Sequence, residues 1–244
     1  MVVNKIYDLQ SDSLQESHRI CLDWVPSGSR VLEFGPATGY MTRVLRDTLH
    51  CKVTGFEFSP EAAALASPFC EQIVVGDIED FNLWAEFNPP YDVIIFADVL
   101  EHLRNPPLVL DRCYALLSET GRIIISVPNI AHWTVRSDLL KGKFEYASCG
   151  LLDNTHLRFF TKKSLFRMVE TSGFLVCEMK FTRMNYPADK IFALARLIWL
   201  KKIFNRAFDH LFPQAAAYQL LVDCRPVPDF ARPRNGPVCE TVSA

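Results

Sequence analysis

The chain has 244 residues, of which 49% are hydrophobic and 12% aromatic, and its formal net charge at pH 7 is −2. This length and composition suit one large α/β domain with a sizeable core. The nearly balanced charge gives no overall basic footprint of the kind that nucleic-acid-binding proteins carry, so we expect no nucleic-acid partner.

Targeting and metal-binding signals are missing from the sequence pattern. The first residues, "MVVNKIYDLQSDS", lack the apolar core of a signal peptide, and no run of residues is long and apolar enough for a membrane-spanning helix. The eight cysteines are scattered, without a C-x-x-C pair or a Cys/His spacing that suits zinc. We therefore expect a cytoplasmic protein with small buried cysteines and no metal site.

Strand-like and helix-like segments alternate in the first half of the chain. Apolar runs predict five strands, at 30–34, 51–58, 71–77, 91–100 and 121–129. Helical spacing or a proline-containing first turn predicts helices at 40–49, 60–69 and 106–118. Because the strands are rich in consecutive Val and Ile, and the segments between them can hold crossover helices, we predict a doubly wound, mostly parallel α/β sheet.

The pattern changes after residue 129. Residues 130–160 are aromatic and lack a clean period, which predicts a long functional loop. A helix at 161–174 and strands at 175–183 and 216–225 complete seven strands, with a helical insert at 187–213 before the last one. The insert could be a lid over the acceptor site, a dimer or partner contact, or a helix on a membrane surface. We predict one domain over 1–225 and a disordered Pro-rich tail over 226–244.

The segment "VLEFGPATGY" (31–40) resembles a ligand-binding turn after a buried strand. Gly35 and Gly39 allow a sharp turn and a close approach of the backbone to a ligand. Ligands in such sheets bind beyond the carboxyl ends of the strands, where Glu57 could accept both ribose hydroxyls and Asp77 an exocyclic amine. The strand ends therefore predict an adenosine-containing cofactor.

The identity of that cofactor depends on Glu33, which stands just before the first glycine. The G-x-G-x-x-G motif of pyrophosphate binding is incomplete, and no P-loop lysine is present. A carboxylate at Glu33 would repel phosphate but suits the ammonium and sulfonium of S-adenosylmethionine (SAM). An oxidoreductase that binds NAD is a weaker alternative for the same reason.

Four motifs in one order make the chain resemble the class I SAM-dependent methyltransferases over residues 15–180: the glycine segment, the ribose acid, "GDI" (76–78) and "YDVIIFADVLEHL" (91–103). The resemblance implies a Rossmann-like methyltransferase fold. It implies cofactor contacts at Glu33, Gly35, Ala37, Gly39, Glu57, Phe58, Asp77, Ile78 and Asp98, with Ala37 where the middle glycine is usual. "SVPNIAHWTVR" and "DNTHLRFFT" are similar to the methionine-biosynthesis W-type proteins and to methyltransferases of polysaccharide pathways.

Three histidines are the candidates for catalysis on the acceptor side. Methyl transfer to oxygen or nitrogen usually needs a group that accepts a proton, and histidine suits this near neutral pH. His102 follows the fourth strand, His132 follows the fifth, and His156 lies in "NTHLRFF". Each could instead be a capping or packing residue. Arg136 and Arg158 could bind an anionic group of the acceptor.

These features predict a SAM-dependent methyltransferase acting on a small molecule, most readily at oxygen. "NPPY" (88–91) precedes the fourth strand rather than ending it, so it is not the motif of amide or base N-methylation. The acceptor could be a sugar or a lipid-linked molecule, with a peripheral membrane contact or a homodimer as further expectations. The alternative is a methyltransferase-like regulatory subunit of a biosynthetic transferase.

Overall fold

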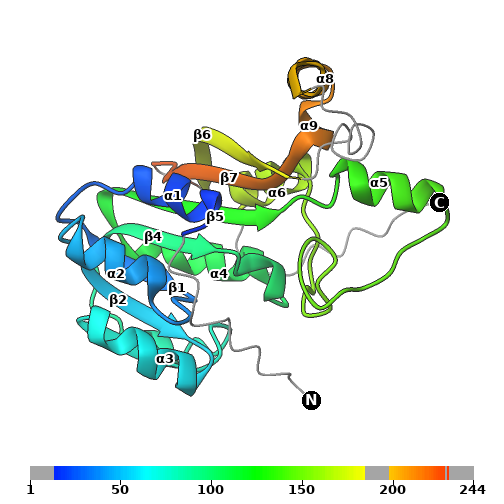
Figure 1. Cartoon of the computed structure of the whole chain (residues 1–244). Coiled ribbons are helices and arrows are strands. Elements are labelled where there is room, and N and C mark those ends of the chain that lie inside the picture. The colour runs from blue at the N-terminus through cyan, green and yellow to red at the C-terminus, as the bar shows by residue number, and fades with distance from the viewer. Residues whose placement is uncertain (1–13, 185–197, 229, 231–244) are drawn as a thin grey trace.

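The computed structural model describes residues 14–184, 198–228 and 230, and its centre is a seven-stranded sheet in the order β3-β2-β1-β4-β5-β7-β6 (Figure 1). The strands are β1 (Arg30–Phe34), β2 (Lys52–Glu57), β3 (Gln72–Val75), β4 (Tyr91–Ala97), β5 (Leu117–Pro128), β6 (Phe174–Arg183) and β7 (Ala217–Pro226). β1 to β5 pair in parallel, whereas β7 runs antiparallel to both β5 and β6. The predicted mostly parallel, doubly wound sheet is confirmed.

Helices cover both faces of the sheet because successive strand residues point to opposite sides. Val31 packs into a cluster with α1 (Glu16–Asp23) and α2 (Tyr40–Asp47), and α3 (Pro60–Ala66) lies against β2. Leu32 and Phe34 pack into the larger cluster with α4 (Pro106–Cys113) and α6 (Lys162–Thr171). Glu33 therefore shares the face of Val31 and α2, beside the glycine turn.

Two helices, α3 and α4, are shorter than the sequence predicts, since their last turns tighten into 3₁₀ helices. These are η1 (Ser67–Phe69) after α3, η4 (Tyr114–Leu116) after α4, and two separate ones, η2 (Leu83–Glu86) and η3 (Leu100–His102). The predicted loop at 130–160 contains α5 (Trp133–Leu140), which corrects that prediction. Its apolar residues follow no helical stripe, so periodicity could not find it; residues 141–150, by contrast, are exposed and contain no helix.

The insert before the last strand is helical where it is described. α8 (Ile198–Leu211) and α9 (Pro213–Ala216) precede β7, and α8 stands away from the sheet in Figure 1. The earlier part of the insert, up to residue 197, lies outside the described residues. No helix in the described ranges is long and apolar enough to cross a membrane.

The chain stays on the domain for a few residues beyond the predicted boundary at 225. β7 ends at Pro226, and the Val227 N–H donates to the Gly173 carbonyl at 2.9 Å. The Tyr114 hydroxyl donates to the Val227 carbonyl at 2.8 Å. The first residues of the predicted tail are thus hydrogen-bonded to the domain beside the start of β6, and residues 229 and 231–244 lie outside the described residues.

The cysteines are only partly the buried residues that we expected. Cys21, Cys51, Cys113 and Cys224 are buried, whereas Cys149 and Cys177 are exposed. All seven described cysteines are free thiols.

Candidate functional site

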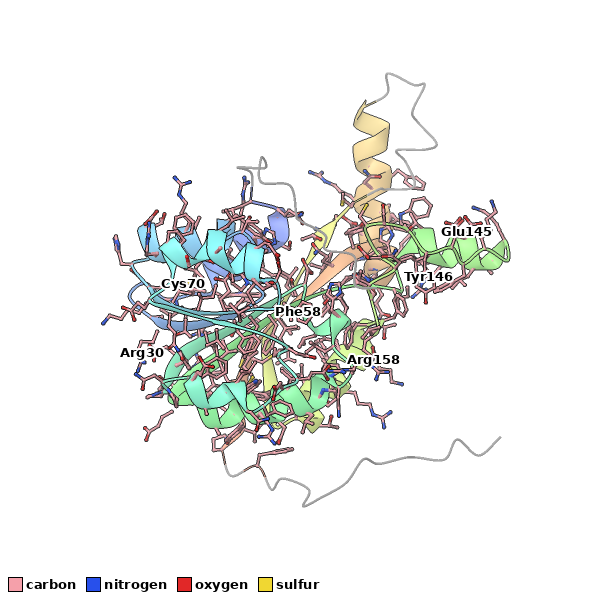
Figure 2. All side chains as sticks on the ribbon, turned by 90° about the horizontal axis from the view of Figure 1, so that it is seen from below. Arg30, Phe58, Cys70, Glu145, Tyr146 and Arg158 are labelled. Carbon is pink, nitrogen blue, oxygen red and sulfur yellow. The ribbon has the colours of Figure 1, made fainter. Side chains whose placement is uncertain are left out.

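The turns after β1, β2 and β4 meet at one edge of the sheet. The three strands are parallel neighbours, and Phe34 pairs in register with both Phe56 and Phe96 near their carboxyl ends. In Figure 2, Phe58 lies between Arg30, at the start of β1, and the side of the molecule that carries Tyr146 and Arg158. The carboxyl edge therefore faces the segment after α5, as expected for a ligand site in an open α/β sheet.

The glycine segment forms a tight turn with three left-handed residues. The φ angles are 70° at Gly35, 50° at Ala37 and 84° at Gly39. The Gly35 N–H donates to the Phe56 carbonyl at 2.8 Å, which holds the turn against β2. A Cβ at Gly39 would lie 2.9 Å from the Ala66 Cα, so α2 and α3 approach there too closely for a side chain. Glycine is therefore needed here for a positive φ angle and, at Gly39, for the lack of space for a Cβ.

Glu57 joins that turn to the next one. One carboxylate oxygen accepts from the Ala37 N–H at 2.9 Å, and the other accepts from the Ser59 N–H at 3.0 Å. The side chain is buried at the end of β2. Each oxygen retains a lone pair beyond its backbone donor, which is what two neighbouring ribose hydroxyls require.

Glu33 is buried beneath the glycine turn. Its exposed fraction is 1%, and one oxygen accepts from the Thr42 hydroxyl at 2.7 Å. Burial raises the pKa of this carboxyl to about 7, and nearby Glu57 raises it further, against the hydrogen bond from Thr42. An adjacent cation would favour the ionised form, so the site is suited to a positively charged ligand.

The predicted adenine side has a fixed acid and an exposed aromatic ring. Asp77 forms an ion pair with Arg104, with 2.7 Å between Oδ2 and Nη2, and the Glu79 N–H donates to its Oδ1 at 2.9 Å. Phe58 is 59% exposed and could cover a ring, whereas Ile78 is buried in the core. No sequence signal shows that Arg104 pairs with Asp77, because Arg104 lies on the loop before α4, outside the motifs.

Asp98 occupies a strained position directly after β4. Its φ is 56°, and its carboxylate accepts from the Ser126 hydroxyl at 3.0 Å and from the Gln219 amide at 2.9 and 3.0 Å. Burial raises the pKa of this acid, against those hydrogen bonds. This unusual backbone angle makes Asp98 a candidate functional residue. Sequence reasoning missed Gln219, since β7 reads only as an apolar strand.

Two of the three candidate histidines lie together. The rings of His102, in η3, and His156 make an edge-on contact with centroids 4.9 Å apart. His102 Nδ1 lies 3.2 Å from the Thr155 carbonyl, and His156 Nδ1 lies 3.4 Å from the Leu151 carbonyl. A carbonyl can only accept, so in both contacts Nδ1 is the donor.

His132 stands apart from that pair. It is fully buried as the N-cap of α5, where Nδ1 lies 2.8 Å from the Thr134 hydroxyl and Nε2 lies 3.2 Å from the Met184 carbonyl. Burial lowers the pKa of His132 to about 4. Because both ring nitrogens have partners within the fold, the geometry supports a structural role rather than the predicted proton transfer.

Glu101 is a residue that sequence reasoning passed over within "LEH". Its side chain is 1% exposed, and neither carboxylate oxygen has a hydrogen-bond partner in the described part of the chain. Burial raises its pKa well above the usual value, and the charges of Asp98 and Asp153 add to this. The only sequence signal for Glu101 was its position shortly after β4, which does not reveal that its side chain is buried without a partner among the described residues.

The two candidate anion-binding arginines are engaged with backbone carbonyls. Arg136 Nε donates to the Ala131 carbonyl at 2.6 Å. Arg158 donates through Nε to the Arg104 carbonyl at 3.1 Å, and through Nη2 to the same oxygen. Arg136 therefore stabilises the turn before α5, and Arg158 joins its own segment to the loop before α4.

Comparison with known proteins agrees with this geometry. A family model described as "Methyltransferase domain" matches residues 9–178. The ubiquinone biosynthesis O-methyltransferase of Paraburkholderia phymatum is 28% identical over 194 residues, covering 75% of this chain and 82% of the relative. That of Xylella fastidiosa strain 9a5c is 34% identical over 110 residues, so the match spans 43% of its length and 42% of this chain.

Solved structures share the fold at low identity. A SAM-dependent methyltransferase from Archaeoglobus fulgidus superposes with a TM-score of 0.59 at 14% identity, covering 84% of this chain and 90% of that one. Magnesium protoporphyrin IX methyltransferase from Synechocystis, solved with bound SAH, gives 0.54 at 13% identity, covering 85% and 78%. The fold, the acids at the strand ends and the family match agree, and the chain belongs to the class I SAM-dependent methyltransferases, with SAM as its cofactor.

Proposed function

We propose that this protein transfers the methyl group of SAM to a hydroxyl oxygen of a small-molecule acceptor. The observation that carries the proposal is the His102–His156 pair, with ring centroids 4.9 Å apart and both Nδ1 atoms directed to carbonyls. His102 follows β4, at the same edge of the sheet as the glycine turn, and His156 comes from the segment between α5 and α6. We infer that one of the two imidazoles accepts the proton that the acceptor hydroxyl has to lose.

The residues at the carboxyl edge fit SAM in charge and hydrogen bonding. Glu33 and Glu57 supply two carboxyl groups around the glycine turn, and Glu57 is positioned by two backbone N–H donors. Asp98, held by Ser126 and Gln219, adds a third carboxyl group after β4. These acids would favour the ammonium and sulfonium of SAM over a pyrophosphate, and Glu57 would accept the ribose hydroxyls.

SAM supplies an electrophilic methyl group with a good leaving group. The acceptor oxygen forms the new O–C bond as the methyl–sulfur bond breaks, and the hydroxyl proton has to leave. We assign the acceptance of that proton to a ring nitrogen of His102 or His156. The protein otherwise has to hold acceptor and methyl donor in line.

The names of the relatives support oxygen as the methylated atom. Those from Paraburkholderia and Xylella are O-methyltransferases of ubiquinone biosynthesis. Hydroxylated aromatic molecules are therefore the first acceptors to test, followed by sugars and lipid-linked molecules. A role for α8 or the insert in covering the acceptor, in dimer formation or in membrane contact remains a prediction.

Binding and turnover measured on the purified full chain test the proposal. We expect calorimetry to show one SAM site per chain, and a panel of catechols and other hydroxylated acceptors to release S-adenosylhomocysteine. His156→Gln should lower kcat about a hundredfold, which is within the usual range for loss of a proton-accepting group, while leaving the SAM affinity unchanged. His50→Asn, at an exposed position before β2, is the matched control.

SAM binding without turnover of any hydroxylated acceptor would contradict the proposed reaction and favour the regulatory-subunit alternative. In that case the chain should co-purify with a biosynthetic transferase and change its rate. Turnover of amine acceptors alone would also contradict transfer to oxygen.

A further inference from the structure

The carboxyl group of Glu101 is buried without a hydrogen-bond partner among the described residues, and a bound cation would provide a partner. Its side chain is 1% exposed in η3, and neither carboxylate oxygen has a hydrogen-bond partner in the described ranges. Burying a carboxylate is costly unless it is paired with a cation or hydrogen-bonded.

The two neighbouring histidines have the arrangement of metal ligands. One carboxylate oxygen of Glu101 and one ring nitrogen each of His102 and His156 all lie within 4.8 Å of one another. Metal-ligating histidines usually donate their second ring N–H to a backbone carbonyl or carboxylate, which fixes the ring and its tautomer. The carbonyls of Thr155 and Leu151 lie 3.2 and 3.4 Å from Nδ1 of His102 and His156, which is where such accepting groups are needed.

We propose that Glu101, His102 and His156 bind a divalent first-row transition cation such as Zn²⁺. Two imidazoles and one carboxylate suit such a cation better than Mg²⁺, which prefers oxygen ligands. Ligands of a tetrahedral zinc ion lie about 3.3 Å apart, given Zn–ligand distances of about 2.0 Å, so the three side chains would close slightly around the ion. Three protein ligands leave one position open.

The open position gives the cation its role in the proposed O-methylation. An acceptor hydroxyl bound there would have a lowered pKa and release its proton to water, leaving an oxygen that attacks the methyl group. The histidines would then hold the cation instead of taking the proton themselves. This role rests on the proposed function, whereas the binding of the cation does not. The sequence predicted no metal site, and this proposal differs from that prediction. The three ligands come from two segments far apart in the chain, so no ligand spacing shows in the sequence.

Titration of the chelator-treated, dialysed full chain with ZnCl₂, CoCl₂ and MgCl₂ tests the site. We expect one tight site for Zn²⁺ with visible absorption on Co²⁺ addition, and at least a hundredfold weaker binding of Mg²⁺. Glu101→Gln and His156→Gln should each weaken the site at least tenfold and remove the Co²⁺ absorption. His210→Gln should leave both intact, and any background from the exposed thiols of Cys149 and Cys177 should persist in all variants.

Circular dichroism and thermal unfolding of each variant show whether it is folded, and Glu101→Gln keeps the shape of the side chain. A Zn²⁺ isotherm that is the same in wild type, Glu101→Gln and His156→Gln would overturn the proposal. So would the absence of Zn²⁺ binding to a protein that still binds SAM and methylates a hydroxyl, an outcome that leaves the proposed function standing. Tight Zn²⁺ binding with no turnover of any hydroxylated acceptor would instead reject the proposed function.

Discussion

At the scale of single residues, the proposed cofactor site contains acids whose ionisation depends on burial and hydrogen bonding. Glu33 is buried under the glycine turn with one hydrogen bond from Thr42, while Glu57 is held by two backbone N–H groups. Burial makes the proton on Glu33 hard to lose until a cation arrives. Cofactor binding should therefore be coupled to release of that proton.

The first prediction concerns the pH dependence of SAM affinity. The pKa of Glu33 is raised to about 7, so below pH 7 binding must first remove the proton, and affinity should rise with pH through this range. Calorimetry should show affinity increasing on the order of tenfold between pH 6 and pH 7.5. Glu33→Gln should bind more weakly and lose this increase; an identical slope in both proteins would contradict the assignment.

The second prediction separates the two constraints on Gly39. Gly39 has φ 84° and no room for a Cβ, whereas Gly28 has φ 78° with nothing within 4 Å of its would-be Cβ. Gly28→Ala should lower the free energy of unfolding by about 1 kcal/mol through backbone strain alone. Gly39→Ala should cost more and also weaken SAM binding at least tenfold, as measured by denaturation and calorimetry. Equal costs for the two substitutions would contradict the crowding argument.

At the scale of elements, the capped starts of α5 and α6 fix the position of the two helices on either side of residues 141–160. α5 begins at His132, whose ring caps the helix and also contacts the Met184 carbonyl after β6. α6 begins with a reciprocal capping box between Thr161 and Ser164. These two helices bracket residues 141–160, so the loop that carries His156 starts and ends at anchored points.

The third prediction assigns His132 to the stability of α5. The pKa of His132 is lowered to about 4, so between pH 6.5 and 4 the unfolded chain binds more protons than the folded chain, and stability falls as pH falls. This residue alone should remove about 2 kcal/mol of unfolding free energy between pH 7 and pH 5. His132→Asn keeps a capping side chain and should lose that dependence in urea unfolding.

The control for this measurement is His50→Asn, at an exposed position with φ 55° that asparagine tolerates. It should leave the pH dependence of unfolding unchanged. We also expect His132→Asn to keep its methyl-transfer rate at pH 7 within a few fold of wild type. A hundredfold loss of kcat with an unchanged fold would restore His132 as a catalytic residue.

At the scale of the whole molecule, residues far apart in sequence complete the site and its support. Asp98 and Gln219 are 121 residues apart, yet two hydrogen bonds join them across β5. The Trp24 indole on the α1 side donates to Glu178 on β6 at 2.9 Å, across 154 residues. The antiparallel β6–β7 pair therefore supports Asp98, which we propose as a cofactor contact.

The fourth prediction tests that contribution through Gln219. Gln219→Leu removes the amide that donates to both oxygens of the Asp98 carboxylate and leaves the donor hydroxyl of Ser126, and hydrogen bonds to charged groups are worth about 1.5–3 kcal/mol. We expect SAM affinity to fall at least tenfold with the fold retained. Thr182→Val is the matched control, because Thr182 contacts Gln219 but not Asp98. An equal loss in both variants would point to general loosening of β7.

The local sequence was sufficient for the sheet and for most of the cofactor acids. Buried parallel strands require consecutive apolar residues, and each strand end is marked by a turn or an acid, so Glu33, Glu57 and Asp98 could be placed at one edge from chain order alone. The left-handed turn at Gly35 follows from the same local signal.

Only the tertiary structure could sort the histidines and find their partners. His132 and His156 both follow the fifth strand in polar loops, and nothing local tells a buried cap from a residue beside His102. Arg104 and Gln219 likewise act through contacts with distant strands. A backbone pattern depends on neighbouring residues, whereas the burial and pairing of a side chain depend on segments that meet only when the sheet has formed.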